Sequence, residues 1–122
     1  MTSPSSLRLP IGPLKIGVAT CATQIEGGRK DTNWAQWAAV PGRIRDGSTP
    51  WKATDHWQLW RADTDLMGEL GLQVYRLGIE WSRIEPSPGE FDEDALARYR
   101  EEIAAVRAAG IEPMVTLHHF SH

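Results

Sequence analysis

Three short apolar segments alternate with longer polar ones along this chain, and this alternation constrains its fold more than any other feature. The apolar segments span 15–20, 72–79 and 111–117, and the last two follow Gly71 and Gly110 almost at once. Short β-branched runs of this kind are typical of buried strands. Strands that alternate with helices pair in parallel, because each helix forms the crossover between them. The pattern therefore predicts an α/β fold with a parallel sheet.

Capping signals mark two helices between the predicted strands. The first begins after Asp55, with Gln58 three residues on as in a capping box, and ends at Gly71. The second begins after Asp92 and ends at Gly110, where a left-handed glycine cap is expected. The sequence thus predicts about three strands and two helices.

The remaining segments show no sustained periodicity. Residues 1–13 are rich in proline and serine and form a predicted loose N-terminal segment. Residues 21–53 hold several glycines and prolines, and we expect a long loop there. A loop of this length inside a compact domain is usually either functional or disordered.

Two α/β folds fit this order, a doubly wound sheet and a (β/α)8 TIM barrel. No G-x-G-x-x-G motif follows the first predicted strand, so the dinucleotide-binding fingerprint is absent. A complete barrel needs about 250 residues, and the chain has 122. We therefore interpret residues 14–122 as the N-terminal first third of a (β/α)8 barrel, incomplete on its own.

Composition excludes several classes of partner. The chain has 13 Lys and Arg against 16 Asp and Glu, a net charge of −3, so no nucleic acid partner is expected. No run of 18 apolar residues predicts a membrane span, and residues 1–6 lack the apolar core of a signal peptide. We therefore expect no membrane partner and a cytoplasmic location. Cys21 is the single cysteine and cannot form an internal disulfide. The oligomeric state is not predicted.

Arg76 is a charged residue inside an apolar strand. Alternation places it on the face opposite Tyr75 and Leu77, which form the better surface for helix packing. Arg76 then points toward the barrel axis, where a guanidinium needs a carboxylate partner. Two interpretations stand about equally. Arg76 either holds an active-site carboxylate or belongs to a structural ion pair in the barrel core.

Polar residues follow the first and third predicted strands. Gln24 is able to bind a pair of sugar hydroxyls, although its position alone favours a bond to the backbone. His118, His119 and His122 cluster after the third strand, and the four-residue spacing of His118 and His122 admits zinc. No Glu or Cys accompanies them, so a substrate-binding histidine is favoured, and neither metal nor cofactor is predicted.

Aromatic and acidic residues near the strand ends are less informative. Trp81 and Phe120 would stack on a sugar or fill the core, and core filling is favoured for Trp81. Glu80, Glu85 and Glu112 offer carboxylates, but nothing in the sequence places two of them as an acid/base pair.

Two long segments resemble a known family. GVATCATQIEGG at 17–28 resembles the N-terminal signature of glycoside hydrolase family 1, the β-glucosidase family, and 53–122 resembles the following stretch almost continuously. The similarity covers about residues 14–122, and the order and spacing of its pieces are highly specific. It implies a (β/α)8 barrel and retaining hydrolysis of β-glycosides.

The resemblance also implies roles for single residues. Gln24 and His119 match residues that bind hydroxyls of the non-reducing sugar, and Phe120 takes the place of an aromatic residue, often Trp, beside them. Arg76 matches the arginine that contacts the nucleophile carboxylate. Residues 81–83 match a structural segment without substrate contact.

Departures from the family pattern bear on sugar preference and on activity. Cys21, Thr23, Gly78 and His118 replace residues that are common in the family, which leaves the sugar preference unspecified. The family's two catalytic glutamates occur on later strands in Asn-Glu-Pro and Glu-Asn-Gly contexts, and neither context occurs here.

The sequence therefore predicts the N-terminal fragment of a retaining β-glucosidase or β-galactosidase, with a β-glycoside as its partner. The fragment by itself is expected to be inactive. The alternative is a truncated non-catalytic product or a weak carbohydrate-binding fragment.

Overall fold

The computed structural model describes residues 12–29 and 31–121. The predicted N-terminal segment, 1–13, therefore lies almost entirely outside the described residues. The elements of the described part follow in the order β1 (Gly17–Ala19), α1 (Ala22–Ile25), α2 (Asn33–Ala38), α3 (His56–Glu69), β2 (Val74–Gly78), α4 (Trp81–Ile84), α5 (Glu93–Ala108) and β3 (Glu112–Thr116).

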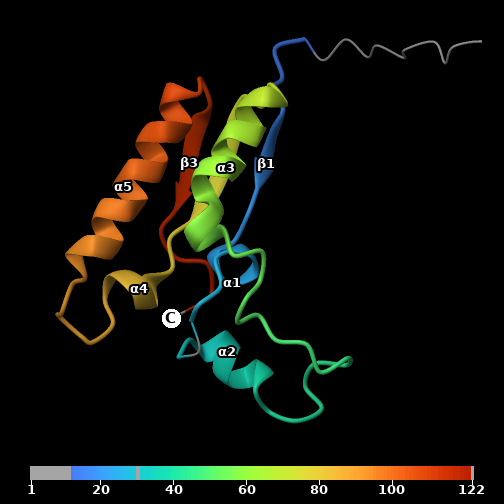
Figure 1. Ribbon diagram of the computed structural model, residues 1–122, viewed down its shortest axis with the longest axis vertical. Helices are drawn as coiled ribbons and strands as arrows, with labels where there is room; N and C mark the ends of the chain where they lie inside the picture. The colour runs from blue at the N-terminus through green and yellow to red at the C-terminus, as the bar shows by residue number, and fades with distance from the viewer. Residues whose placement is uncertain (1–11, 30, 122) are drawn as a thin grey trace, which may run out of the picture.

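The three strands form one parallel sheet in the order β1-β2-β3. Val18 pairs with Tyr75 in register, and Tyr75 in turn pairs with Pro113. The two long helices, α3 and α5, lie side by side along the same face of this sheet (Figure 1). The predicted parallel α/β arrangement is confirmed.

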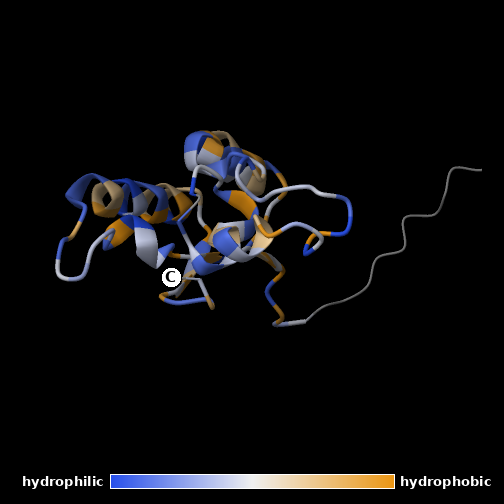
Figure 2. Cartoon of the chain, turned by 90° about the horizontal axis from the view of Figure 1, so that it is seen from below, coloured by the Kyte–Doolittle hydropathy of each residue, from blue (hydrophilic) through white to orange (hydrophobic). Residues whose placement is uncertain are grey.

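The apolar core lies between the sheet and the two long helices. Tyr75 and Leu77 on β2 are 1% and 2% exposed, and they pack with Met67 of α3 and Val106 of α5. This confirms the predicted helix-packing face of the strand. Figure 2 shows hydrophobic and hydrophilic residues interspersed along the helices, as expected where only one side of each helix faces a core.

The boundaries of α5 follow the sequence signals. The Asp92 side chain accepts a hydrogen bond of 2.9 Å from the backbone N–H of Ala95. Gly110, just past the helix, has a φ of 78°, a left-handed conformation that glycine adopts without steric cost. The cap and the glycine terminator predicted for this helix are both confirmed.

The helix α3 begins directly after Asp55, as predicted, but the predicted capping by the Asp55 side chain is wrong. Asp55 itself has a left-handed φ of 58°, and its side chain makes no capping hydrogen bond. One N–H of the first turn bonds to a distant backbone group, because the Glu26 carbonyl accepts a hydrogen bond of 3.2 Å from the N–H of Trp57. The end of α3 is as predicted, since Gly71 follows it with a φ of 68°.

The segment 21–53 is not one long loop. It holds α1 and α2, and Thr32 begins α2 by accepting a hydrogen bond of 3.1 Å from Ala35 N–H. The short helix α4 was not predicted either. These helices have four to six residues, too few to show the two-turn repeat by which an amphipathic helix is recognised.

Trp81 does not fill the core, contrary to the expectation. The residue is 37% exposed, and its indole Nε1 donates a hydrogen bond of 2.7 Å to the Glu85 side chain. Trp81 begins α4, and its hydrogen-bond partner Glu85 directly follows that helix, so the bond keeps the indole along the outside of α4.

The opposite face and the edges of the sheet keep large apolar side chains exposed. Met114, which pairs with Arg76, is 57% exposed. Other exposed apolar side chains on or beside the strands are Leu14, Ile16, Val18, Val115 and Leu117. Parallel sheets are normally covered on both faces, and open apolar edges favour association.

We predict that the 122-residue chain by itself associates and unfolds without a sharp transition. Replacing Val18 of β1 and Leu117, which directly follows β3, together by lysine should increase the monomer fraction, because lysine on or beside an exposed edge strand opposes edge pairing. Size-exclusion chromatography and thermal unfolding measure both effects. The equally apolar Leu70, at the end of α3, is the control, and Leu70→Lys should have little effect. A clean monomer with one sharp, cooperative unfolding transition contradicts this prediction.

Candidate active site

The carboxyl ends of the three strands meet at one end of the sheet. The chain leaves β1 into α1, leaves β2 into α4, and continues from β3 toward the described C-terminal residues, and all three segments lie at the same end of the molecule (Figure 1). In (β/α)8 barrels the segments that follow the strands build the active site. The predicted site residues Gln24, His119 and Phe120 all lie on these segments.

A cavity of about 230 Å³ lies among these segments. It is lined by Cys21, Thr23, Gln24, Trp34, His119 and Phe120. The structure thus brings three predicted site residues to one cavity, although Gln24 is almost a hundred positions from the other two. Trp34 was not among the predicted site residues, because it lies on the short helix α2 that no periodicity revealed.

Phe120 is held at the rim of the cavity by its backbone. Its φ of 61° is left-handed, and its carbonyl accepts a hydrogen bond of 3.0 Å from the Asn33 side chain on α2. The ring is 71% exposed and stands at 76° to the His119 ring, with 5.3 Å between the ring centroids. An exposed ring beside polar groups is able to stack against an apolar ligand surface.

Arg76 lies on the uncovered face of β2 and reaches the cavity through His119. Its Nη1 is 3.3 Å from Nδ1 of His119. A guanidinium only donates, so Nδ1 of a neutral His119 is the acceptor, and the ring proton is on Nε2. Among the residues that the structure describes, no ion pair involves Arg76. Both interpretations of Arg76 therefore still require a carboxylate from elsewhere.

The three carboxylates considered in the sequence do not form an acid/base pair. Glu112 forms an ion pair with Lys15 and stands at the start of β3, away from the cavity. Glu85 accepts from Trp81, whereas Glu80 is 2% exposed and accepts a hydrogen bond of 3.3 Å from Thr23. None of the three lines the 230 Å³ cavity.

Of the two histidines considered for zinc, only His118 is among the described residues, since His122 lies outside them. Within residues 12–29 and 31–121, no three His, Cys, Asp or Glu side chains are placed to hold a metal ion. A helix long and apolar enough to cross a membrane is likewise absent from this part of the chain.

A buried ion pair that the sequence reasoning missed lies behind the cavity. Glu26 is 4% exposed, and its Oε2 accepts a hydrogen bond of 2.7 Å from Arg83 Nε. The Tyr99 hydroxyl donates to Oε1 at 2.7 Å. Burial raises the pKa of the Glu26 carboxyl, and the charge of Arg83 opposes that rise. Burial also raises the pKa of Tyr99, so its hydroxyl stays protonated and is the donor of this hydrogen bond.

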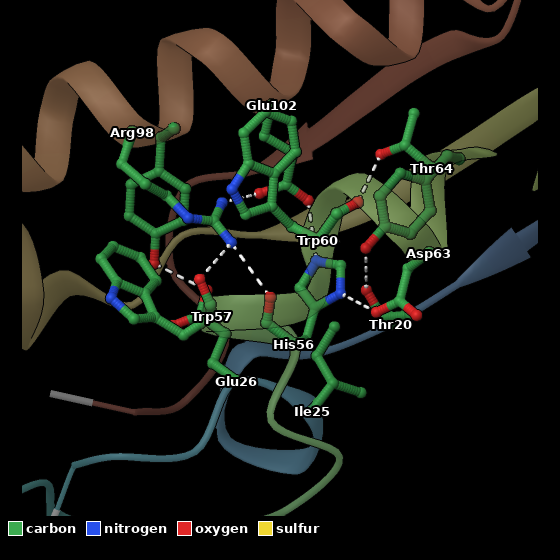
Figure 3. Close-up of polar contacts among 12 residues, drawn as sticks. Thr20, Ile25, Glu26, His56, Trp57, Trp60, Asp63, Thr64, Arg98 and Glu102 are labelled. Carbon is green, nitrogen blue, oxygen red and sulfur yellow. Dashed lines mark hydrogen bonds and ion pairs between the residues drawn. The ribbon is translucent and has the colours of Figure 1, made fainter. Parts of the chain in front are cut away.

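A second charged cluster joins α3 to α5 (Figure 3). His56 is 4% exposed and bonds to a carboxylate on each side, to Asp63 at 2.5 Å through Nδ1 and to Glu102 at 2.8 Å through Nε2. Carboxylate oxygens only accept, so both ring nitrogens carry protons and His56 is an imidazolium. Glu102 also forms an ion pair with Arg98.

These contacts determine the pKa shifts of the cluster. Burial alone would lower the pKa of His56, but hydrogen bonds to Glu102 and Asp63 raise it above the usual value. Burial alone would raise the pKa of Glu102, but the hydrogen bond from His56 and the charge of Arg98 hold it below the usual value. The cluster is therefore most favourable with a charged imidazolium and a charged Glu102.

Trp57 connects the two charged clusters. The guanidinium of Arg83 lies 3.9 Å from the centroid of the Trp57 ring, and that of Arg98 lies 4.4 Å from it. Arg98 also donates to the carbonyls of His56 and Trp57 at 3.2 Å. Stacked guanidinium groups are attracted by the electron-rich face of an indole, so the start of α3 is fixed against α4 and α5.

Comparisons of the sequence and of the structure with known proteins all indicate the same family. The sequence model of glycosyl hydrolase family 1 matches residues 12–122. Beta-glucosidase 42 of Arabidopsis thaliana is 40% identical over 111 residues, and a beta-glucosidase of an Agrobacterium species is 36% identical over 128 residues. These matches cover 85% and 98% of this chain.

Solved structures agree with the sequence matches. The family 1 β-glucosidase of Thermotoga maritima has a TM-score of 0.82 at 33% identity, over 87% of this chain and 26% of that one. A β-glucosidase from the fungus Humicola insolens, solved in complex with glucose, has a TM-score of 0.82 at 37% identity, over 87% and 24%.

The chain spans about a quarter of the relatives that it matches, with 23% of the Arabidopsis protein and 28% of the Agrobacterium protein covered. It corresponds to an N-terminal portion of them. Below, "the full-length protein" means this segment joined to the remainder of such a barrel.

The charged cluster predicts a pH dependence of stability. Because the pKa of His56 is raised in the folded state, its contribution is fully present below the unfolded value of 6.5 and is lost as pH rises through the folded pKa. Because the pKa of Glu102 is lowered, its contribution is present above 4.5 and is lost on acidification. The free energy that the cluster adds to folding should thus be largest between pH 4.5 and 6.5.

The variant His56→Gln should remove the decline on the alkaline side and lower the free energy of unfolding by about 1–3 kcal/mol at acidic pH, because Asp63 and Glu102 lose a charged hydrogen-bond donor. Thermal unfolding of the full-length protein from about pH 5 to about pH 9 measures both effects. His118, which is exposed, provides the control variant His118→Gln. An unchanged pH dependence in His56→Gln would show that another group titrates.

Proposed function

Because the chain belongs to glycosyl hydrolase family 1, we propose that it supplies the first part of the sugar-binding site of a retaining β-glycosidase. The substrate class is β-glucosides or β-galactosides, and the activity is that of the full-length protein. The observation that carries the proposal is the 230 Å³ cavity that Gln24, His119 and Phe120 line together. A cytoplasmic location of this protein stays a prediction.

The side chains around the cavity suit a sugar ring. The Gln24 amide donates and accepts at once, which fits two neighbouring hydroxyls. His119 receives a hydrogen bond from Arg76 on Nδ1, so its Nε2–H is left to donate to a hydroxyl. Phe120 offers an exposed ring to the apolar C–H face of the sugar. These three contacts would hold and orient the non-reducing sugar.

The chemistry itself requires two carboxyl groups about 5–5.5 Å apart. One protonates the leaving oxygen while the other attacks the anomeric carbon and forms a glycosyl-enzyme, which water then hydrolyses with the first group as base. No carboxylate of the described residues lines the cavity. In this proposal both groups come from the remainder of the barrel, as the family resemblance implies.

Arg76 has a separate role in this proposal. It lies beside His119 on the uncovered face of β2, where its charge faces the rest of the barrel. A cation within about 4–6 Å lowers the pKa of a carboxyl by about 1–3 units. Arg76 would thus keep the nucleophile ionised and hold its orientation.

We predict that the 122-residue chain alone does not hydrolyse an activated aryl β-glucoside, because the two carboxyl groups are missing. The assay uses purified chain at high concentration, and the full-length protein is the positive control. Turnover that persists after contaminating enzymes have been removed contradicts the proposal. Saturable binding of the glucoside without turnover would instead favour the weak carbohydrate-binding alternative.

In the full-length protein, Arg76→Met should lower kcat/KM by about 100-fold or more, because a misplaced nucleophile is costly. Methionine keeps the apolar stem, so the melting temperature should change little. The acidic limb of the kcat/KM profile should move to higher pH, because the nucleophile loses its neighbouring cation.

The matched control for this variant is Arg107→Met, an exposed arginine in the last turn of α5. Its rate and pH profile should equal those of the unmodified protein. A near-normal rate and an unmoved acidic limb in Arg76→Met would show that Arg76 is only a structural residue.

A further inference from the structure

The helix that carries Gln24 is too short to be stable on its own. It has four residues, Ala22–Ile25, and no side chain caps its first turn. A single helical turn gains too few hydrogen bonds to offset the loss of chain entropy. The orientation of the Gln24 side chain must therefore be fixed by contacts from outside α1.

Those contacts converge on Glu26, the residue that directly follows α1. Its carboxylate accepts from Arg83 Nε and from the Tyr99 hydroxyl, each at 2.7 Å, and Arg83 also donates to the carbonyl of Gly27. Arg83 belongs to α4 and Tyr99 to α5. The turn after β1 is thus bound to the segments that follow β2 and precede β3.

Backbone contacts fix the same turn from the other side. The N–H of Gly28 donates to the Trp51 carbonyl at 2.6 Å. Gly27 has a φ of 71°, and a Cβ there would lie 2.3 Å from the Lys52 carbonyl oxygen, so only glycine fits. Thr54 donates from its hydroxyl to the Ile25 carbonyl at 3.0 Å.

Helical geometry connects the buried Glu26 to the exposed Gln24. The backbone of Glu26 is still helical, and its N–H donates to the Ala22 carbonyl. Residues two apart on a helix differ in direction by about 200°, so they face opposite sides. Holding Glu26 inward thereby turns Gln24 outward, toward the cavity that it lines.

We propose that Glu26 is a positioning residue for sugar binding, which acts through Gln24 without touching the substrate. Its ion pair with Arg83 and its hydrogen bond with Tyr99 hold the α1 turn, and the turn aims the Gln24 amide at the sugar hydroxyls. The proposal rests on the proposed function, since it assumes that Gln24 binds sugar.

A double-mutant cycle in the full-length protein tests the coupling. Glu26→Gln keeps the shape of the side chain but removes its charge. It should lower kcat/KM for an aryl β-glucoside by about 10- to 100-fold, because the Gln24 amide is no longer held in its orientation. Gln24→Ala should cost a similar factor. The double variant should be no slower than Gln24→Ala, because Glu26 has nothing left to position. Glu85→Gln is the control and should leave kcat/KM unchanged, because Glu85 is a half-buried carboxylate that bonds to Trp81 and Gly89 and not to the α1 turn.

A second measurement does not depend on activity. Hydrogen–deuterium exchange of residues 21–28 should become at least about tenfold faster in Glu26→Gln, because the anchor of the turn is lost. Exchange in the second half of α5, around Val106, should stay as it is. Tyr99→Phe removes one of the two side-chain hydrogen bonds to Glu26 and keeps the aromatic ring. It replaces Glu26→Gln in this measurement if that variant fails to fold. Exchange at residues 21–28 should then also become faster, by a smaller factor.

The outcomes separate the two proposals. Losses in kcat/KM that add in the double variant would overturn the positioning role, and so would unchanged exchange at residues 21–28. A full-length protein without β-glycosidase activity would overturn the proposed function. In that case faster exchange in Glu26→Gln would still show that Glu26 anchors the α1 turn.

Discussion

The buried carboxylate of Glu26 is the group on which the arrangement of the strand ends depends. It follows β1, Arg83 follows β2 on α4, and Tyr99 lies on the helix that precedes β3. One carboxylate therefore reaches all three strand–helix units of the described chain. A buried charge that loses its partner costs about 3–5 kcal/mol, so alternative placements of these segments, which would separate the three groups, are strongly disfavoured.

The helix layer is fixed by charge as well as by apolar contact. The two charged clusters contain three carboxylates and three cations, namely Glu26, Asp63 and Glu102 with Arg83, Arg98 and the protonated His56. Tyr75 and Leu77 anchor the same helices to the sheet through apolar packing. Both kinds of contact involve one face of the sheet, and Met114 on the other face stays 57% exposed.

Much of this fold was predictable because its signals are local. The alternation along β2 predicted that Tyr75 and Arg76 lie on opposite faces of the sheet, and this is confirmed. The cap at Asp92 is confirmed too, and both signals involve neighbours in sequence. Asp55 precedes α3 as predicted but makes no side-chain cap, and the carbonyl of Glu26, from a distant turn, accepts from that helix end instead. The Glu26–Arg83 pair spans 57 positions, and a buried ion pair leaves no periodic pattern in the sequence. Residue type and position suggested sugar binding by Gln24, a histidine and Phe120, and the resemblance specified it. These roles stay predictions, and the structure adds that Gln24, His119 and Phe120 line one cavity.

The most direct measurement of the central claim is a crystal structure of the full-length protein with a bound, non-hydrolysable thio-β-glucoside. The account predicts the sugar ring in the cavity, with the Gln24 amide and His119 Nε2 within about 3 Å of its hydroxyls. It also predicts Phe120 against the ring and the Glu26 carboxylate still bonded to Arg83, without contact to the sugar. A ligand bound elsewhere, or one in the cavity that neither Gln24 nor His119 contacts, would contradict the account.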